Sequence, residues 1–273
     1  MMSDLDVLAQ AVHAAEGKFL VVVTGAGISL ASGIPTFRGQ DKAAVWRRDV
    51  TELGTFRYFL TDPVGSWRWY LERFDRVFAA LPNPAHHALV ALEAWQRQRG
   101  GSFLLVTQNI DTLHEQAGAR DHVKVHGSAD RVRCPSEGCR YGSPTGSLPR
   151  DEAGLAAFRR EPNASNLPRC PACGTILRQH VLWFDESYDS HADYQWERVC
   201  EAGEQGDLFL FVGTSFSVGV TEYLVQSALA RRRPVLSVDP HAVPVAPMIT
   251  GLRTPAELLL PALVERLAGE ALR

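Results

Sequence analysis

Four short runs of apolar residues are spread along the chain, and each of them ends in small polar residues. The runs cover residues 19–23, 103–107, 207–212 and 234–239. Short runs without polar alternation are typical of strands that are buried on both faces of a sheet. In the stretches between these runs, apolar residues recur at the spacing of a helix. The alternation predicts an α/β fold with a mostly parallel, doubly wound sheet.

Residues 1–16 and 62–80 have the clearest helical spacing. The first stretch has an amphipathic pattern, and the second begins at Asp62-Pro63, which is typical of a helix start. Its expected apolar stripe contains Trp67, Tyr70, Phe74, Val77 and Leu81. Further helices are expected over 84–98, 112–117, 151–160 and 254–272, with a brief strand over 123–126. Residues 41–62 have no clear period.

The predicted strands end in polar residues that ligands commonly contact. In doubly wound sheets, ligands bind at the carboxyl ends of the strands, so these residues should meet in one crevice. They are Thr24 and Gly25, Gln108 and Asn109, Gly213, Thr214 and Ser215, and Ser237 and Asp239.

The turn after the first strand resembles part of a dinucleotide-binding fingerprint. Gly25 and Gly27 let the backbone approach a diphosphate, but the third glycine is replaced by Leu30 and no ribose-binding acid follows about 20 residues on. A glycine turn without a ligand remains the alternative. Residues 34–39 favour the nucleotide site, because this loop has no packing period and carries Phe37 and Arg38.

Two further groups carry candidate chemistry. Gln108, Asn109 and Asp111 offer amides and a carboxylate suited to ribose hydroxyls or a carboxamide, although Asn and Asp also cap helices. His126 lies between a strand end and Gly127. It is a candidate general base, with a structural histidine as the alternative.

Four of the five cysteines form two pairs that predict a metal site. Cys134 and Cys139 are followed, thirty residues later, by Cys170 and Cys173. Such pairs indicate a tetrahedral zinc ion, while a redox pair would need a βαβ context. Four thiolates fill the coordination sphere, so the zinc ion is expected to be structural.

The amino-acid composition indicates which classes of binding partner to expect. The net charge is −3 and the hydrophobic fraction is 45%. Neither value suggests a nucleic-acid or membrane surface, so nucleic acid is an unlikely partner. With no leader pattern at the start and zinc-type cysteines, we expect a cytoplasmic protein.

Together the motifs resemble the sirtuin family of NAD-dependent protein-lysine deacylases. The resemblance rests on a series of motifs that occur in order from about residue 19. They are GAGIS-x-x-SGIP-x-FRG, TQNID-x-LH-x-x-AG, HGS, the two cysteine pairs and GTS. The resemblance implies a Rossmann-like NAD-binding domain over 1–40, 81–128 and 180–273. It also implies a small lobe made of a helical module (41–80) and a zinc-ribbon module (129–179). An acyl-lysine tunnel would lie between them.

The same resemblance implies a role for each matching residue. His126 is the expected base, with Asn109 and Asp111 orienting the ribose, and peptide and acyl contacts are expected from Val181, Trp183, Phe184, Tyr70 and Arg73. The implied products are nicotinamide, free lysine and O-acyl-ADP-ribose. The implied NAD contacts are Gly25, Ala26, Gly27, Phe37, Arg38, Gln108, Asn109, Ile110, Asp111, Gly213, Thr214, Ser215, Ser237, Asp239 and Ala256.

The chain departs from the family pattern at three places and matches a subgroup at one. Residues 40–46 replace Gly-Leu-Trp, Asp185 replaces the glycine of WFGE, and Ser237 stands where many relatives have Asn. Tyr70 and Arg73 match the Tyr-x-x-Arg of sirtuins that remove succinyl or malonyl groups, so desuccinylation or demalonylation is expected beside deacetylation. An ion pair between Arg73 and a surface carboxylate such as Asp75 is the alternative. At the level of function, the alternatives are an ADP-ribosyltransferase on the same scaffold and a non-catalytic binding module.

Overall fold

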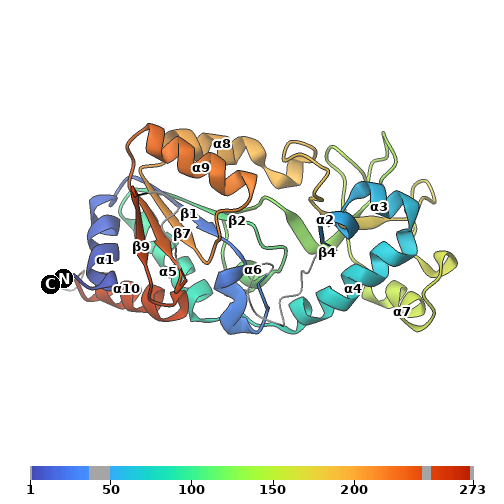
Figure 1. Cartoon of the computed structure of the whole chain (residues 1–273), viewed down its shortest axis with the longest axis horizontal. Coiled ribbons are helices and arrows are strands. Elements are labelled where there is room, and N and C mark those ends of the chain that lie inside the picture. Colours follow the sequence, from blue (N-terminus) through green and yellow to red (C-terminus); the bar gives the residue numbers. More distant parts are fainter. Residues whose placement is uncertain (1, 37–49, 242–246, 271–273) are drawn as a thin grey trace.

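The structure is a computed structural model that describes residues 2–36, 50–241 and 247–270. Within these ranges the chain forms a six-stranded sheet and a three-stranded sheet. Figure 1 shows the larger and the smaller part side by side along the long axis of the molecule. The chain passes between the two parts more than once, so neither part is one continuous segment.

The six strands of the larger sheet are all parallel, in the order β3-β2-β1-β7-β8-β9. Four of them confirm the apolar runs, and β3 confirms the brief strand predicted over 123–126, although it begins at His122 and ends at Lys124. The sixth, β9, was not predicted, because the two central residues of this short strand are exposed. The strands are β1 (Phe19–Thr24), β2 (Ser102–Thr107), β3 (His122–Lys124), β7 (Leu208–Val212), β8 (Val235–Val238) and β9 (Ile249–Leu252).

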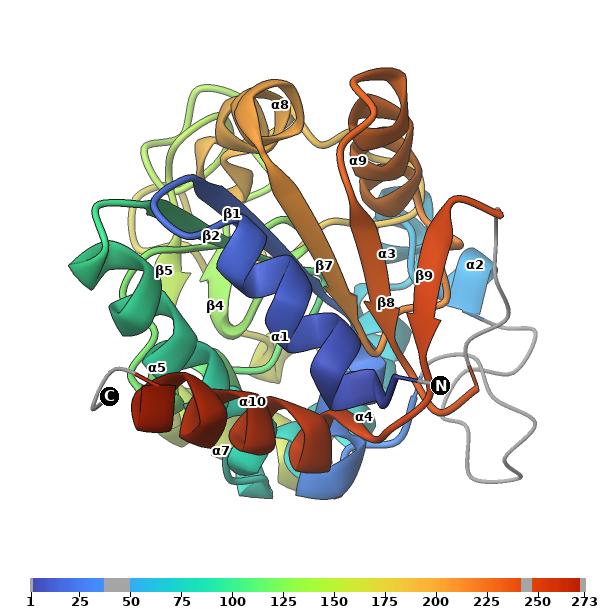
Figure 2. The ribbon, with the colours of Figure 1, turned by 90° about the vertical axis from the view of Figure 1, so that its left-hand side faces the viewer.

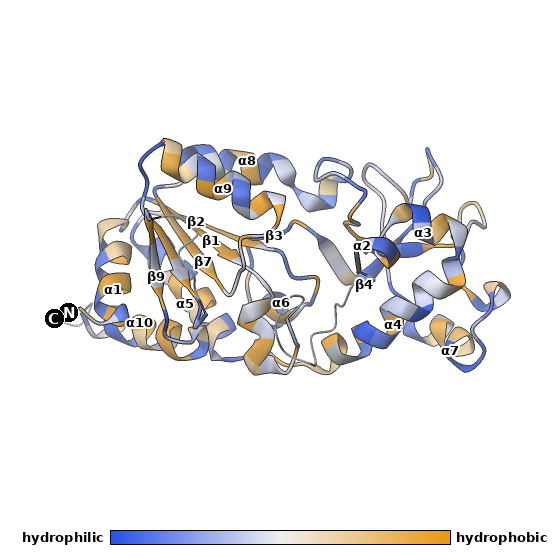
Figure 3. Ribbon diagram, viewed as in Figure 1, coloured by the Kyte–Doolittle hydropathy of each residue, from blue (hydrophilic) through white to orange (hydrophobic). Residues whose placement is uncertain are grey.

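Helices cover both faces of this sheet, which confirms the doubly wound prediction. Alternate residues of β1 serve the two faces: Leu20 and Val22 pack into one core, and Val21 and Val23 into the other. Figure 2 shows α1 and α10 crossing one face, with α8 and α9 opposite. In Figure 3 the sheet is the hydrophobic layer between them. The helices are α1 (Asp4–Ala14), α5 (Pro84–Gln98) and α10 (Ala256–Glu270) on one face, and α8 (Trp196–Gln205) and α9 (Gly219–Ala230) on the other.

The smaller part has its own hydrophobic core. Trp67 and Phe74 of α4 pack in one cluster with Val132 of β4, Phe158 of α7 and Trp183. The helical segment and the cysteine segment are thus packed together, and their division into separate modules stays a prediction. The elements are α2 (Val50–Leu53), α3 (Phe56–Thr61), α4 (Pro63–Ala79), α7 (Glu152–Arg160) and the antiparallel strands β4 (Gly127–Arg133), β5 (Leu148–Pro149) and β6 (Arg178–Val181).

Helix ends follow the expected capping chemistry, with one correction. Asp62 caps α4 by accepting from the backbone of Gly65 at 2.8 Å, and the predicted helix over 84–98 is confirmed as α5. Leu81 was wrongly placed on the apolar stripe of α4, because the helix ends at Ala79 and Leu81 is 73% exposed. Proline at 82 and 84 ends the helix there.

Candidate active site

The carboxyl ends of the central strands are joined by hydrogen bonds between their loops. The backbone N–H of Gly25 donates to Val212 at 3.0 Å and that of Gly213 to Val238 at 2.9 Å. The backbone N–H of Gln108 donates to Thr24 at 2.9 Å. The polar residues after β1, β2, β7 and β8 therefore lie along one sheet edge, as the sequence predicted.

The glycines of the first turn are required by the neighbouring loop. A Cβ on Gly25 would lie 2.7 Å from the carbonyl oxygen of Gly213, and one on Gly27 would lie 2.6 Å from the Cα of Gly213. Gly213 itself has a φ of +60°. These positions exclude side chains even before a ligand is considered. The short helix that follows is η1 (Ala26–Ser32).

The predicted amides cross-link the loops. Nε2 of Gln108 donates to the backbone oxygen of Thr24 at 3.2 Å and to Oγ1 of Thr214 at 3.1 Å. Nδ2 of Asn109 donates to the backbone oxygen of Gly25 and to Oγ of Ser29, both at 3.1 Å. Both amides are thus fixed in position by neighbouring loops.

Asp111 is a buried carboxylate at the same edge. Its oxygens accept from the hydroxyl of Ser29 and from the backbone N–H of Leu113, each at 3.0 Å. Burial raises the pKa of Asp111, while the N–H of Leu113, the Lys124 ammonium and the Ser29 hydroxyl act in the opposite direction. The position of this charge is therefore set by several neighbours.

His126 joins β3 to β4 and lies against the loop that carries the amides. Its Nδ1 is 2.8 Å from the carbonyl oxygen of Gln108, which only accepts, so Nδ1 carries the proton. The lone pair is then on Nε2, 3.3 Å from the hydroxyl of Tyr188. Burial lowers the pKa of His126 to about 4. The imidazole is therefore neutral near pH 7 and can accept a proton at Nε2.

Tyr188 is a neighbour of His126 that the sequence did not reveal. Its ring stacks on His126 with centroids 5.8 Å apart and on Trp196 at 4.6 Å. Its hydroxyl also accepts from the backbone N–H of Val220 at 3.3 Å. No spacing rule connects residues 126 and 188, because they are far apart in the chain and meet only where Tyr188 packs on the core that contains Val125.

The remaining predicted NAD contacts are spread around this edge. Ser215 bonds Ser217 at 2.7 Å, and Asp239 accepts from the backbone of His241 at 2.8 Å. Ser237 is buried inside β8, and Ala256 is the first residue of α10. Ile110 packs against the core of the smaller part. Phe37 and Arg38 lie outside the described residues, as does the altered loop at 40–46.

The predicted peptide-binding segment runs past His126. Val181 pairs with Gly127, and the N–H of Leu182 donates to the carbonyl of His126 at 2.9 Å. Trp183 is buried, whereas Phe184 is 56% exposed. The segment therefore exposes one aromatic ring to solvent and buries the other in the core.

A buried ion-pair cluster that the sequence did not predict holds this segment. Glu186 accepts from Arg178 at 2.5 and 2.9 Å, from Arg133 at 2.7 Å and from the backbone N–H of Trp183 at 2.9 Å. The guanidinium of Arg178 lies 3.3 Å from the centroid of the Trp183 ring. Burial works to raise the pKa of Glu186, but the two guanidiniums lower it by more.

The two predicted acyl-binding residues lie on the same helix in different surroundings. Tyr70 is buried with its ring 6.2 Å from that of Trp183, and burial raises its pKa. Arg73 donates to the carbonyl of Trp69 at 2.7 Å and lies over the Trp69 ring. Asp75, which the sequence offered as an alternative partner of Arg73, is bound by Arg159 at 2.8 Å.

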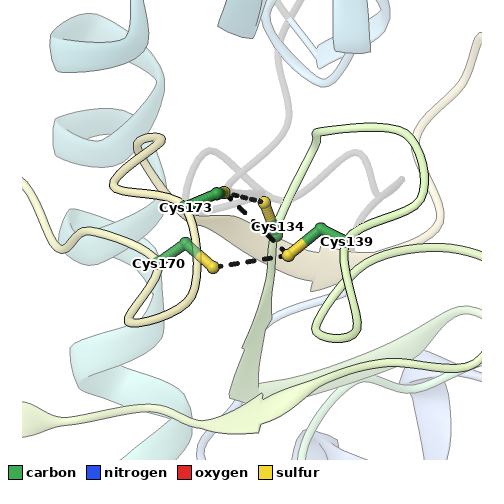
Figure 4. A group of neighbouring side chains, drawn as sticks. All are labelled: Cys134, Cys139, Cys170 and Cys173. Atoms are coloured by element: carbon green, nitrogen blue, oxygen red, sulfur yellow. Dashed lines mark hydrogen bonds between the residues drawn. The ribbon is translucent and has the colours of Figure 1, made fainter.

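The four cysteines converge as predicted (Figure 4). The sulfur of Cys134 is 3.5 Å from that of Cys173, and the sulfur of Cys139 is 3.6 Å from Cys170 and 3.9 Å from Cys173. Zinc–sulfur bonds of about 2.3 Å in a tetrahedron place the sulfurs about 3.8 Å apart. The thiols thus fit a structural zinc ion, held between the end of β4 and the turn at 170–173.

Within the described ranges, no helix combines the length and the apolar character that crossing a bilayer requires.

Comparisons with known proteins agree with this geometry. The model of the Sir2 family matches residues 25–220. An NAD-dependent protein deacylase of Thermus thermophilus is 40% identical over 252 residues, which cover 90% of this chain and 91% of the relative. The mitochondrial NAD-dependent protein deacylase sirtuin-5 of Danio rerio is 34% identical, with 95% and 86% covered.

Solved structures give the same result. A Sir2 homologue in complex with NAD is 33% identical, with a TM-score of 0.78 over 98% of this chain and 95% of that one. Another, in complex with ADP-ribose, is 32% identical with a TM-score of 0.80 over 97% of each chain. On the family match and the extent of these similarities, the chain belongs to the Sir2 family, the sirtuins.

Proposed function

We propose that this protein is an NAD-dependent protein-lysine deacylase in which His126 is the general base. The observation that carries the proposal is the state of His126. The imidazole is neutral, its Nδ1–H is held by the carbonyl of Gln108, and its lone pair is on Nε2. The deacylase names of relatives at 34–40% identity over most of the chain support the same activity.

The residues around the sheet edge have separate roles in the proposed reaction. NAD, when bound, supplies the ADP-ribosyl group that accepts the acyl chain and releases nicotinamide. Nε2 of His126 takes the proton of a ribose hydroxyl, which makes that oxygen nucleophilic. Asn109 and Asp111 orient the ribose, and their bonds to Ser29 hold them in place before the ligand arrives. The zinc ion takes no part, because its four ligands are all protein thiolates.

The acylated lysine would enter along residues 181–184. This segment is hydrogen-bonded to His126 through Leu182, so a lysine bound beside it reaches the base. The exposed ring of Phe184 offers apolar surface to the flanking peptide.

We further propose that acidic acyl groups, succinyl or malonyl, are preferred over acetyl. Tyr70 and Arg73 are one helical turn apart on α4, and Tyr70 packs beside Trp183 of the peptide segment. A carboxylate at the end of the acyl chain would take the guanidinium of Arg73 and the phenol of Tyr70 as donors. Hydrogen bonds to charged groups contribute about 1.5–3 kcal/mol each.

Both proposals, the deacylase activity and the preference for acidic acyl groups, can be tested by mass spectrometry. The protein is incubated with NAD and with matched acetyl and succinyl peptides, and the products are identified. Deacylated peptide with O-acyl-ADP-ribose supports the deacylase, whereas ADP-ribosylated protein without deacylation would point to the transferase alternative. Arg73→Met should lower kcat/KM for the succinyl peptide by about tenfold or more and leave the acetyl peptide nearly unchanged. Arg160→Met, on an exposed arginine of α7, is the control. An equal loss on both peptides would make Arg73 a structural residue and end the acidic-acyl proposal.

A further inference from the structure

Lys124 makes three polar contacts in a chain that otherwise favours arginine. The sequence has 28 lysines and arginines, and its only lysines are at 18, 42 and 124. The ammonium of Lys124 donates to the backbone oxygen of Asp111, to Oγ of Ser128 at 2.8 Å and to Oε1 of Glu115 at 2.8 Å. Its side chain is 11% exposed. A lysine ammonium has three N–H donors, and here three acceptors surround it.

The three acceptors lie on different segments around His126. Asp111 belongs to the loop after β2, Glu115 to α6 (Leu113–Ala117) and Ser128 to β4. Lys124 is two residues before His126, and Ser128 is two residues after it. The ammonium therefore joins the loop of Asn109 and Asp111 to the strand that carries the proposed base.

The charge of Lys124 also acts on the carboxyl of Asp111. Among the described residues, the groups that act on this carboxyl include the Ser29 hydroxyl of η1, the Leu113 N–H and Glu115 of α6, and Lys124 of β3. Burial raises the pKa of Asp111 and Glu115 adds to that effect, whereas the positive charge of Lys124 lowers this pKa. Without Lys124, the carboxyl of Asp111 would be protonated at a higher pH.

We infer that Lys124 is a positioning residue for the reaction, which holds Asp111 in place and in its charged form beside His126. The inference rests on the proposed function, because it assigns a task to Asp111 in the ribose site. It predicts two separable effects. The hydrogen bonds need three donors in a compact arrangement, whereas the electrostatic effect needs only a positive charge near Asp111.

Two substitutions separate these effects. Lys124→Met keeps the length of the side chain and removes both charge and donors. It should lower kcat/KM by about tenfold or more at pH 7 and move the acidic limb of the pH profile up by about one pH unit. Lys124→Arg keeps the charge but replaces the compact ammonium by the larger, planar guanidinium group. It should leave the acidic limb in place while recovering only part of kcat/KM. Lys18→Met is the control, since Lys18 is exposed and, among the described residues, its ammonium donates only to the carbonyl of Ala14.

A binding measurement tests the role of Lys124 without relying on deacylase activity. The affinity for ADP-ribose is measured by calorimetry on the wild type and on the Lys124→Met, Lys124→Arg and Lys18→Met variants. If the wild type has no deacylase activity, the function fails, but Lys124→Met should still bind ADP-ribose about tenfold more weakly because Asp111 is displaced. The inference is overturned if Lys124→Met retains wild-type ADP-ribose affinity. It is equally overturned if the acidic limb of an active Lys124→Met variant does not move, since Lys124 would then be a structural residue only.

Discussion

Replacing Glu186 by glutamine should destabilise the protein strongly, although the change removes no side-chain volume. The carboxylate is bound by Arg178 and Arg133, whose side chains are each 2% exposed, and is itself 14% exposed. Glu186→Gln keeps the shape and one acceptor oxygen but leaves two buried guanidiniums without their counter-charge. The same oxygens hold the backbone of Trp183.

The magnitude follows from the cost of an uncompensated buried charge. Removing one partner of a buried pair costs about 3–5 kcal/mol, out of a total stability of about 5–15 kcal/mol. For a chain of this size, 1 kcal/mol corresponds to about 2–4 °C in the melting temperature, so the expected loss is roughly 6–20 °C. Because the amide oxygen of the introduced glutamine can still accept one hydrogen bond, we expect a loss of melting temperature toward the lower end of this range.

Thermal unfolding followed by circular dichroism measures this loss, with Asp75→Asn as the control. Asp75 pairs with Arg159 at 2.8 Å, but the two side chains are 55% and 33% exposed, so its loss should cost under about 1 kcal/mol. The pKa of Glu186 is lowered in the folded state. Its stabilisation is therefore complete above the unfolded value of about 4.5 and is lost as the pH falls through the folded value. A Glu186→Gln melting temperature within about 2 °C of wild type at pH 7 would refute the reasoning.

Two further predictions concern the zinc site and the base. Cys173→Ala should lower both the zinc content and the melting temperature, because metal-binding energy contributes to the folding of this small part; a zinc-free variant of wild-type stability, by atomic absorption and thermal melting, would contradict the structural role. His126→Ala should lower deacylation by about 100- to 10,000-fold while NAD still binds by calorimetry, and near-wild-type turnover would remove His126 from the mechanism.

The fold could be predicted from local signals, because the central strands of a parallel sheet are buried on both faces and therefore appear as apolar runs. The cysteine pairs gave the zinc site for a similar reason, since their spacing is a local property. The strand β9 was missed because it lies at the sheet edge and its two central residues are exposed, so that it does not appear as an apolar run. The helices α8 and α9 lie in a stretch that we had not assigned.

Contacts between distant segments could not be predicted in this way. Tyr188 meets His126 through packing on the core of the larger part, and Arg133 of β4 and Arg178 of β6 meet Glu186 within the smaller part. Charged residues are usually exposed, so nothing in the sequence distinguishes these two arginines from the others. The sequence identified candidate chemistry at the sheet edge, while the structure identified what holds that chemistry in place.

Asp185 shows how a departure from the family pattern acquires a physical explanation. An Asp in place of the Gly of WFGE raises the question of which groups its carboxylate contacts. In the structure both carboxylate oxygens are used, because they accept from the backbone N–H groups of Phe56 and Arg57 at 2.7 and 3.1 Å. These are the first two residues of α3, where a negative charge stabilises a helix N-terminus.

The same segment is tied to the helical module a second time, since the N–H of Phe184 donates to the carbonyl of Gly54 at 3.0 Å. Residues 184 and 185 therefore connect the peptide segment directly to the helices that precede Tyr70. Because Trp183 also packs against Tyr70 and is held by Glu186, the proposed peptide groove and the proposed acyl pocket share one rigid framework. The carboxylate of Asp185 is directed at the first turn of α3. If the proposed function holds, we expect Asp185 to add little to the selection of charged peptides, and we expect selectivity to depend on the shape of this framework and on α4.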